Sequence, residues 1–292
     1  MAKGEPKRIA RRFLVSVAAV ALCAAAGVLA QPVRGTAALA VHDRYLAAWN
    51  AQDADAFAAT LHYPHARQAP GAPGSTSWQG AEEYAAGMDF GPLIARGWVH
   101  SYWDARSVVQ VDSGKVHVAA RARRVDAAGQ TIQTVQTLYV ITEHDGRWGV
   151  QARFSVGPPA TGRVADASRK AAVAAVEAYL DAVNRRDAQA FAATMHYPHY
   201  RITRAGQVQA WEGAREVAST MTFDRLASTG WVRTAAHNVN PVLVSADAVN
   251  VALELLRYNA AGEQIARFDT LYLVTREDGR WAFKGRSSFA PR

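Results

Sequence analysis

The side chains best suited to chemistry in this sequence are histidines in a repeated tetrapeptide. His-Tyr-Pro-His occupies residues 62–65 and returns at 196–199. Two imidazoles three residues apart could act as acid and base or as metal ligands, with His65 as a candidate base and His199 as a candidate ligand contact. Proline interrupts a helix between them and no third ligand recurs in both copies, so we predict no metal site. The alternative is that the imidazoles cap a helix-to-strand turn.

A further histidine belongs to the first copy alone. Trp98, His100 and Tyr102 alternate along an expected strand, and of the three only the tryptophan returns in the second copy, as Trp231. Alternation would place the three side chains on one face, where His100 is a candidate base for a lyase or hydrolase. The alternative is an aromatic strand that packs against a helix. The carboxylates available to orient the imidazole are Asp89 and Asp104.

Arginine and aromatic residues also recur at equivalent positions. Arg153 and Arg286 stand in the last expected strand of each copy. An inward arginine would bind a carboxylate or phosphate strongly, whereas an exposed one would form a structural ion pair. Tyr139 and Tyr272 lie on hairpin strands where aromatic residues are favoured, so core packing is their simplest role.

The candidates are paired because the chain is duplicated. Residues 45–65 and 179–199 are identical at 15 of 21 positions, and the match continues after the offset changes from 134 to 133 residues. A period of this length predicts two globular domains rather than a solenoid. We place the domains at 36–157 and 171–291, joined by a Pro- and Gly-containing linker at 158–170.

Helical signals precede strand signals in each copy. Residues 36–51 carry apolar side chains at three- and four-residue steps, Asp53 caps a second helix that Pro64 ends, and a third helix begins near Gly80. After Gly97, turn residues separate runs rich in Val, Thr, Tyr and Trp, which is typical of antiparallel hairpins. The expected fold class is α+β, with three helices packed in a bent, mainly antiparallel sheet in each domain.

The N-terminus has the order of an export signal. Five basic residues precede an uncharged run over 13–30 that ends in small residues. Residues 1–30 are therefore expected to be a signal peptide or an uncleaved membrane anchor, which places both domains outside the cytoplasm, periplasmic, secreted or attached to the inner membrane. We expect no membrane contact beyond this segment.

The net charge of +8 comes largely from that segment. Without it 28 Lys and Arg face 24 Asp and Glu, and the basic residues are scattered. This pattern argues against nucleic-acid binding. The only cysteine, Cys23, lies within the apolar run, so no disulfide framework is expected.

Motifs at both ends of each copy resemble a known family. The opening Y-L-x-A-x-N-x-x-D and the closing T-L-Y-x-x-T-x-x-D-G-R-W are similar to the SnoaL-like branch of the nuclear-transport-factor-2-like superfamily, which includes the ketosteroid isomerases, and they suggest an uncharacterised bacterial-type branch. The resemblance implies a cone in which a bent sheet wraps the helices and leaves a mainly apolar pocket. Such cones serve isomerases, dehydratases, cyclases and hydrolases, and also binding and association domains without chemistry.

The resemblance allows a residue-level test of isomerase chemistry. It places Tyr45 and Tyr179 where those enzymes have an oxyanion-hole tyrosine. Proton abstraction also needs a general base and a second acid. No carboxylate stands at the four positions where the resemblance puts them, which are Ala69, Thr203, Leu138 and Leu271.

We therefore expect an exported binding protein without isomerase chemistry or a cofactor, which holds a small, largely apolar molecule in at least one cone. One alternative is a lyase or hydrolase that uses His100 or His65. Another is an association module whose sheets pair face to face, as an internal pseudo-dimer or a homodimer, with Arg121 and Glu254 attracting one another across the interface. The predicted ligand contacts are Tyr45, Trp78, Trp98, Tyr139, Arg153, Tyr179, His199, Trp211, Trp231, Tyr272 and Arg286.

Overall fold

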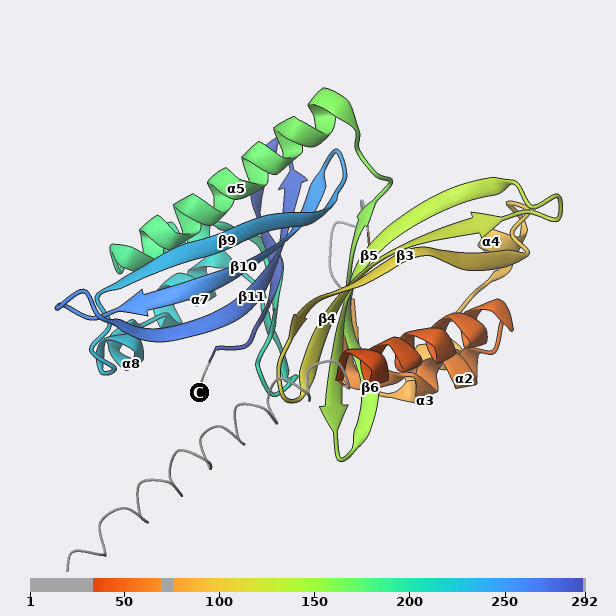
Figure 1. The fold of residues 1–292 in the computed structure, drawn as a ribbon, viewed down its shortest axis with the longest axis horizontal. Helices are drawn as coiled ribbons and strands as arrows, with labels where there is room; N and C mark the ends of the chain where they lie inside the picture. Colours follow the sequence, from red (N-terminus) through yellow and green to blue (C-terminus); the bar gives the residue numbers. More distant parts are fainter. Residues whose placement is uncertain (1–33, 70–75, 291–292) are drawn as a thin grey trace, which may run out of the picture.

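The computed structural model describes residues 34–69 and 76–290, and it confirms the expected α+β class with two tandem cones (Figure 1). Each repeat forms one six-stranded mixed sheet, in the order β2-β1-β6-β5-β4-β3 in the first and β8-β7-β12-β11-β10-β9 in the second. Helices line the concave side of each sheet. The leader expected over 1–30 lies outside the described residues. Within the described part of the chain, none of the helices combines the length and apolar character that crossing a bilayer requires.

The two repeats use the same element order. The first repeat contains a helix over 34–50, α2 (Ala54–Ala59), β1 (Leu61–Gln68), β2 (Thr76–Trp78), α3 (Ala81–Ala86), α4 (Gly91–Ile94), β3 (His100–Val111), β4 (Lys115–Val125), β5 (Thr131–His144) and β6 (Arg147–Gly157). The second contains α5 (Gly162–Asn184), α6 (Ala188–Ala193), β7 (Met195–Ile202), β8 (Val208–Trp211), α7 (Ala214–Thr220), α8 (Asp224–Ala227), β9 (Arg233–Val244), β10 (Ala248–Tyr258), β11 (Gln264–Glu277) and β12 (Arg280–Ser288).

The second helix of each repeat is capped as expected. The Asp53 side chain accepts a hydrogen bond from the Ala56 amide at 2.8 Å, and Asp187 does the same for Ala190 at 2.8 Å. Each cap satisfies an amide that would otherwise lack an intrahelical partner. The same local sequence thus starts the same helix twice.

The tetrapeptide His-Tyr-Pro-His does not end a helix, contrary to expectation. α2 stops at Ala59, and Pro64 lies inside β1, after a cis peptide bond with Tyr63. β1 pairs in parallel with β6, and its register shifts between Leu61 and Ala66. An irregularity of this kind accommodates a residue that has no amide hydrogen for the ladder. The two imidazoles are therefore strand side chains, not caps of a turn.

The connection between the repeats is shorter than expected. α5 begins at Gly162 and runs to Asn184, so that residues 162–170 of the expected linker are helical. Only residues 158–161 join β6 to this helix. Figure 1 shows α5 lying across the sheet of the second repeat. The Pro and Gly residues of the segment mark where the first domain ends rather than a longer spacer.

β4 shows how one strand serves two cores. Val116, Val118 and Ala120 pack in the cluster that includes the first helix, as the alternating pattern indicated. On the opposite face, Ala119 belongs to a cluster with residues of β10 and β11 from the second repeat, including Leu271. The convex faces of the two sheets therefore pack against each other.

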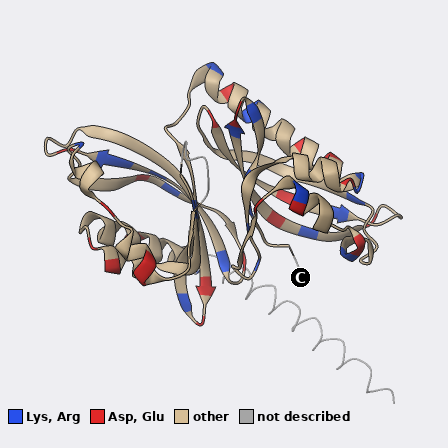
Figure 2. Cartoon of the chain, turned by 180° about the vertical axis from the view of Figure 1, so that it is seen from behind, with Lys and Arg blue, Asp and Glu red and all other residues tan. Residues whose placement is uncertain are grey.

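Buried polar side chains connect the two sheets. Lys115 Nζ donates to the carbonyls of Thr203 and Ser288, both at 2.8 Å, and Gln110 Nε2 donates to the carbonyl of Thr270 at 3.0 Å. The pair suggested from sequence does not form. Arg121 lies 3.9 Å from Asp104, and Glu254 pairs with Arg267, each within its own repeat. Lys, Arg, Asp and Glu are interspersed over both repeats (Figure 2).

Candidate ligand-binding site

Arg153 on β6 occupies the centre of the first cone. It is 7% exposed, and it donates from Nε to His65 Nε2 at 3.2 Å, from Nη1 to Tyr45 OH at 2.7 Å and from Nη2 to Tyr84 OH. The acceptors are neutral groups, and no ion pair joins this guanidinium to a carboxylate among the described residues. The side chain is inward, as one of the two sequence readings had it. Its donors, however, are already bonded within the protein.

Aromatic rings fill the rest of the first cone. His42 stacks on Trp103 with 4.3 Å between ring centroids and meets the edge of Tyr139 at 4.0 Å. The rings of Trp78 and Tyr84 also pack together, with 4.7 Å between their centroids. Burial, and then the charge of Arg106, lower the pKa of His42 to about 3, so this ring is a neutral packing group. The predicted contacts Tyr45, Trp78, Tyr139 and Arg153 are thus gathered here, but against one another.

His65 is not a free base. Its Nδ1–H donates to the Val150 carbonyl at 3.0 Å, so Nε2 carries the lone pair that accepts from Arg153. Burial, followed by the Arg153 charge, holds the pKa of His65 well below its ordinary value. To take a proton, this imidazole would have to release Arg153 first.

His100 lies at the start of β3 and is half-buried. Its Nε2 is 3.1 Å from Asn50 Nδ2, and its ring lies 4.6 Å from the exposed ring of Tyr102. The carboxylates expected to orient it are engaged elsewhere, since Asp104 pairs with Arg123 at 3.0 Å and Asp89 accepts from the Gly91 amide at 2.7 Å. Neither of the two carboxylates expected to orient His100 is therefore its partner.

Trp98 does not share a face with His100, contrary to the sequence reading. β3 begins only at His100, and Trp98 precedes the strand, where it is 2% exposed and donates from Nε1 to Ser101 Oγ at 2.9 Å. In the second repeat Trp231 does the same, donating from Nε1 to Thr234 Oγ1 at 2.8 Å. Both tryptophans are structural anchors between a helix and a strand.

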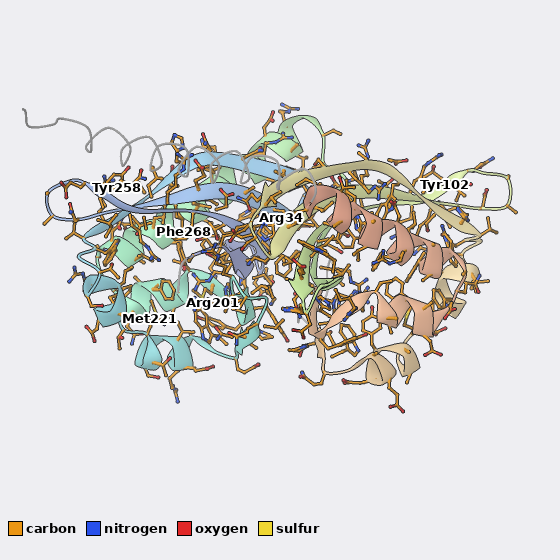
Figure 3. The ribbon with its side chains drawn as sticks, turned by 60° about the horizontal axis from the view of Figure 1, so that its bottom comes forward. Arg34, Tyr102, Arg201, Met221, Tyr258 and Phe268 are labelled. Carbon is orange, nitrogen blue, oxygen red and sulfur yellow. The ribbon has the colours of Figure 1, made fainter. Side chains whose placement is uncertain are left out.

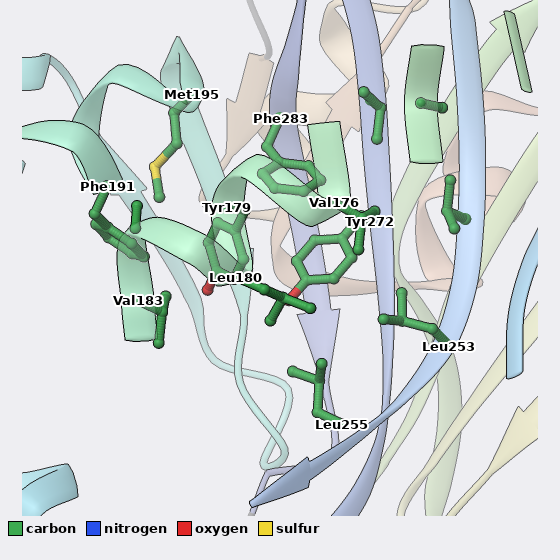
Figure 4. Packing of buried hydrophobic residues seen from close by; sticks show 14 of the residues in the cluster. Val176, Tyr179, Leu180, Val183, Phe191, Met195, Leu253, Leu255, Tyr272 and Phe283 are labelled. Atoms are coloured by element: carbon green, nitrogen blue, oxygen red, sulfur yellow. The ribbon is translucent and has the colours of Figure 1, made fainter. Parts of the chain in front are cut away.

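The second cone contains a cavity of about 760 Å³. This size is within the range of small-molecule pockets. Figure 3 shows Arg201, Met221 and Phe268 in this cone, and in Figure 4 the hydroxyls of Tyr179 and Tyr272 point to the side where Leu255 lies. The apolar and aromatic lining includes Tyr179, Val183, Phe191, Trp211, Met221, Phe223, Leu226, Leu255, Phe268 and Tyr272.

Divergence between the copies accompanies this cavity. Three ring side chains of the first cone have valine at the equivalent positions; one of these valines, Val183, lines the cavity, and the other two lie in the core cluster to which several lining residues belong. At two other lining positions the second cone has the larger side chain, since Leu255 and Phe268 stand where the first cone has Ala122 and Val135. The three pairs with valine are His42 and Val176, Trp49 and Val183, and Tyr84 and Val217.

The predicted contacts of the second copy divide into two groups. Tyr179, Trp211, Tyr272 and Arg286 line the cavity. His199 stands behind Trp211, with ring centroids 5.6 Å apart, and its Nδ1–H donates to the Phe283 carbonyl at 3.2 Å. Burial and the nearby Arg286 lower the pKa of His199 to about 3.

Sequence reasoning missed the other arginines of the cavity. Its lining contains five arginines and, among the described residues, neither Asp nor Glu. Arg204 is paired with Asp112 of the first repeat at 2.6 Å. Recurrence across the two copies could have identified two more, because Arg67 and Arg124 are the counterparts of Arg201 and Arg257. The described residues contain no cluster of His, Cys, Asp or Glu that could hold a metal ion.

Comparisons with known proteins agree with this architecture. A family model described as NTF2-like protein (DUF6841) matches residues 37–156 and again residues 169–285. The chain belongs to this NTF2-like family. The resemblance to the nuclear-transport-factor-2-like superfamily in two tandem copies is thereby confirmed. No curated protein matches the chain.

Solved structures similar to an NTF2-like repeat of this chain come from several bacteria. A domain with a cystatin-like fold from Nostoc punctiforme is 23% identical over 45% of this chain and 80% of its own, with a TM-score of 0.36. A ketosteroid isomerase-like protein from Erwinia carotovora is 24% identical over 42% of this chain and 98% of its own, with a TM-score of 0.30. The protein Aln2 from a Streptomyces species is 18% identical over 43% of this chain and 91% of its own, with a TM-score of 0.36.

Proposed function

We propose that the chain is an exported binding protein whose second NTF2-like repeat holds a small molecule with a largely apolar body. The observation that carries the proposal is the cavity of about 760 Å³ in the second cone, at the place where rings pack together in the first. Export is supported by the basic and then apolar order of residues 1–30. Isomerase chemistry is not part of the proposal, because the base and acid positions hold no carboxylate.

Filling the cavity with the first cone's own residue tests the proposal. Val217→Tyr places a phenol where Tyr84 stands, next to Phe191 and Trp211, which match the neighbours of Tyr84. The purified chain should show thermal shifts with members of an apolar metabolite library, and the variant should lose them. Val232→Tyr makes the same change at a site of the same repeat that is 41% exposed, and should keep them. Equal shifts in all three proteins would refute binding in this cone.

We further propose that the first repeat serves the second as a packing partner, forming an internal pseudo-dimer. Lys115 of the first repeat bonds the carbonyls of Thr203 and Ser288, and both residues line the cavity. The first repeat thereby fixes backbone at the cavity wall. A compact monomer in sedimentation velocity is the expected result, and an elongated one would contradict this role.

A further inference from the structure

Of the three arginines that recur in both cones, two have side-chain partners in the first. Arg153 uses all of its donor nitrogens on His65, Tyr45 and Tyr84. Arg124 on β4 stands opposite Gln133 on β5, and its Nη1 donates to Gln133 Oε1 at 2.7 Å. The third, Arg67, lies exposed on β1. Two of the three guanidiniums in the first cone are thus bonded to side chains of their own domain.

Two of these partners, Gln133 and Tyr84, are replaced by apolar residues in the second cone. Arg257 on β10 stands opposite Ala266, which occupies the position of Gln133 and has no acceptor. Val217 stands at the position of Tyr84, and among the described residues Arg286 donates to Tyr179 OH, at 2.5 Å. The divergence removed hydrogen-bond acceptors and kept the arginines.

Two buried guanidinium donors of the second cone are left without partners. Among the described residues, the Nε atoms of Arg201 and Arg286 have no hydrogen-bond partner, and neither has Nε2 of His199, which stands at the position of His65. Arg257 makes a cation–π contact with Phe268, at 4.8 Å from the ring centroid, and Arg286 makes one with Trp211 at 5.6 Å. Buried guanidinium donors are normally satisfied, and an anion with two oxygens fits their planar fork.

The electrostatics of the cavity favour the same kind of ligand. The charge of Arg286, followed by burial, lowers the pKa of Arg201 to about 10. Burial and Arg286 also lower the pKa of Arg257. These guanidiniums repel one another inside a cavity whose described lining has no carboxylate. A bound anion would relieve the repulsion, whereas a neutral ligand would leave it in place.

We propose that the second cone binds an amphipathic anion, with its charged head held by Arg201, Arg257 and Arg286 and its apolar body against the aromatic lining. The head group is a carboxylate or a phosphate ester, since both present oxygens to a guanidinium fork. This inference rests on the proposed binding function and adds the chemical class of the ligand.

Matched ligands separate the inference from the function on which it rests. Calorimetric titration of the full chain with decanoate, decyl phosphate and decan-1-ol compares three head groups on one apolar body. We expect at least one of the anions to bind about 10- to 100-fold more tightly than the alcohol, as expected for a charge-assisted hydrogen bond or two. Whichever anion binds more tightly identifies the head group. Equal affinity for all three would overturn the inference and leave the binding function standing, whereas no binding by any would refute both.

Restoring one lost partner tests the role of the arginines. Ala266→Gln supplies the acceptor that Arg124 has in the first cone, and should weaken the preferred anion about tenfold while leaving decan-1-ol unchanged. Ala260→Gln makes the same change at an exposed turn and should alter neither. Arg257→Met is a second test that introduces no new amide. It should also weaken the affinity for the anion and leave the affinity for decan-1-ol unchanged. Unchanged anion affinity in Ala266→Gln and Arg257→Met together would overturn the inference.

Discussion

The same substitution at two equivalent arginines should have unequal effects on stability. In the first cone, Arg153→Met removes three hydrogen bonds inside the core, to His65, Tyr45 and Tyr84. A hydrogen bond within a protein contributes about 1 kcal/mol to stability. The loss of three such bonds should lower the free energy of unfolding by about 3 kcal/mol.

In the second cone, Arg286→Met removes one hydrogen bond, to Tyr179, and a ring contact with Trp211. Relief of charge repulsion does not distinguish the two variants, because Arg153 repels Arg67 as Arg286 repels Arg201. Since one hydrogen bond contributes about 1 kcal/mol, the free energy of unfolding should fall by about 1 kcal/mol.

Thermal and urea unfolding of the two variants without ligand will measure this difference. A loss of about 3 kcal/mol corresponds to a fall in Tm of roughly 6–12 °C for a domain of this size, against a few degrees for Arg286→Met. Methionine is apolar and fits irregular space, so both variants should fold. Equal falls in Tm would refute the division between an arginine bonded within its own core and one left open to a ligand.

Three further outcomes follow from single contacts. Burial lowers the pKa of Lys115 from 10.5 to about 7, so between these two pH values the unfolded chain holds more protons than the folded one. The free energy of unfolding should therefore rise with pH in this range, by at most about 1.4 kcal/mol per pH unit. Urea titrations at several pH values should show this rise, and Lys115→Met should flatten it. His100→Ala should leave calorimetric ligand affinity unchanged, and a loss of binding or of any turnover would argue for the enzyme alternative. A Cβ at Gly149 would lie 2.7 Å from His62 Cδ2, so Gly149→Ala should lower the free energy of unfolding by about 1–3 kcal/mol. Gly114→Ala is the control: its Cβ would lie no nearer than 3.9 Å to any atom, so it should change the free energy of unfolding by less than about 0.5 kcal/mol.

The duplicated sequence predicted the fold well because its signals are local. The Asp53 cap, the third helix beginning after Gly80 and the hairpins after Gly97 appear where turn and cap chemistry placed them. β1 was missed because its proline imitates a helix end, and because its partner β6 lies about 85 residues away in the chain. Pairing over that separation leaves no mark in a local pattern.

The candidate site was predictable only in part. Aromatic residues and Arg286 could be chosen because they recur, and Arg201 and Arg257 recur equally and could have been chosen too. The sequence could not tell which cone is open, since that depends on which side chains face each other. The pairs that decide whether an arginine has a protein partner, Arg124 with Gln133 and Arg257 with Ala266, likewise follow from strand register.

The most direct test of a filled first cone and an open second cone is the number of ligands bound per chain. Native mass spectrometry of the full chain with whichever decyl anion binds more tightly should show one ligand per chain, and none for Val217→Tyr. Two ligands per chain, or one that Val217→Tyr does not displace, would contradict the account.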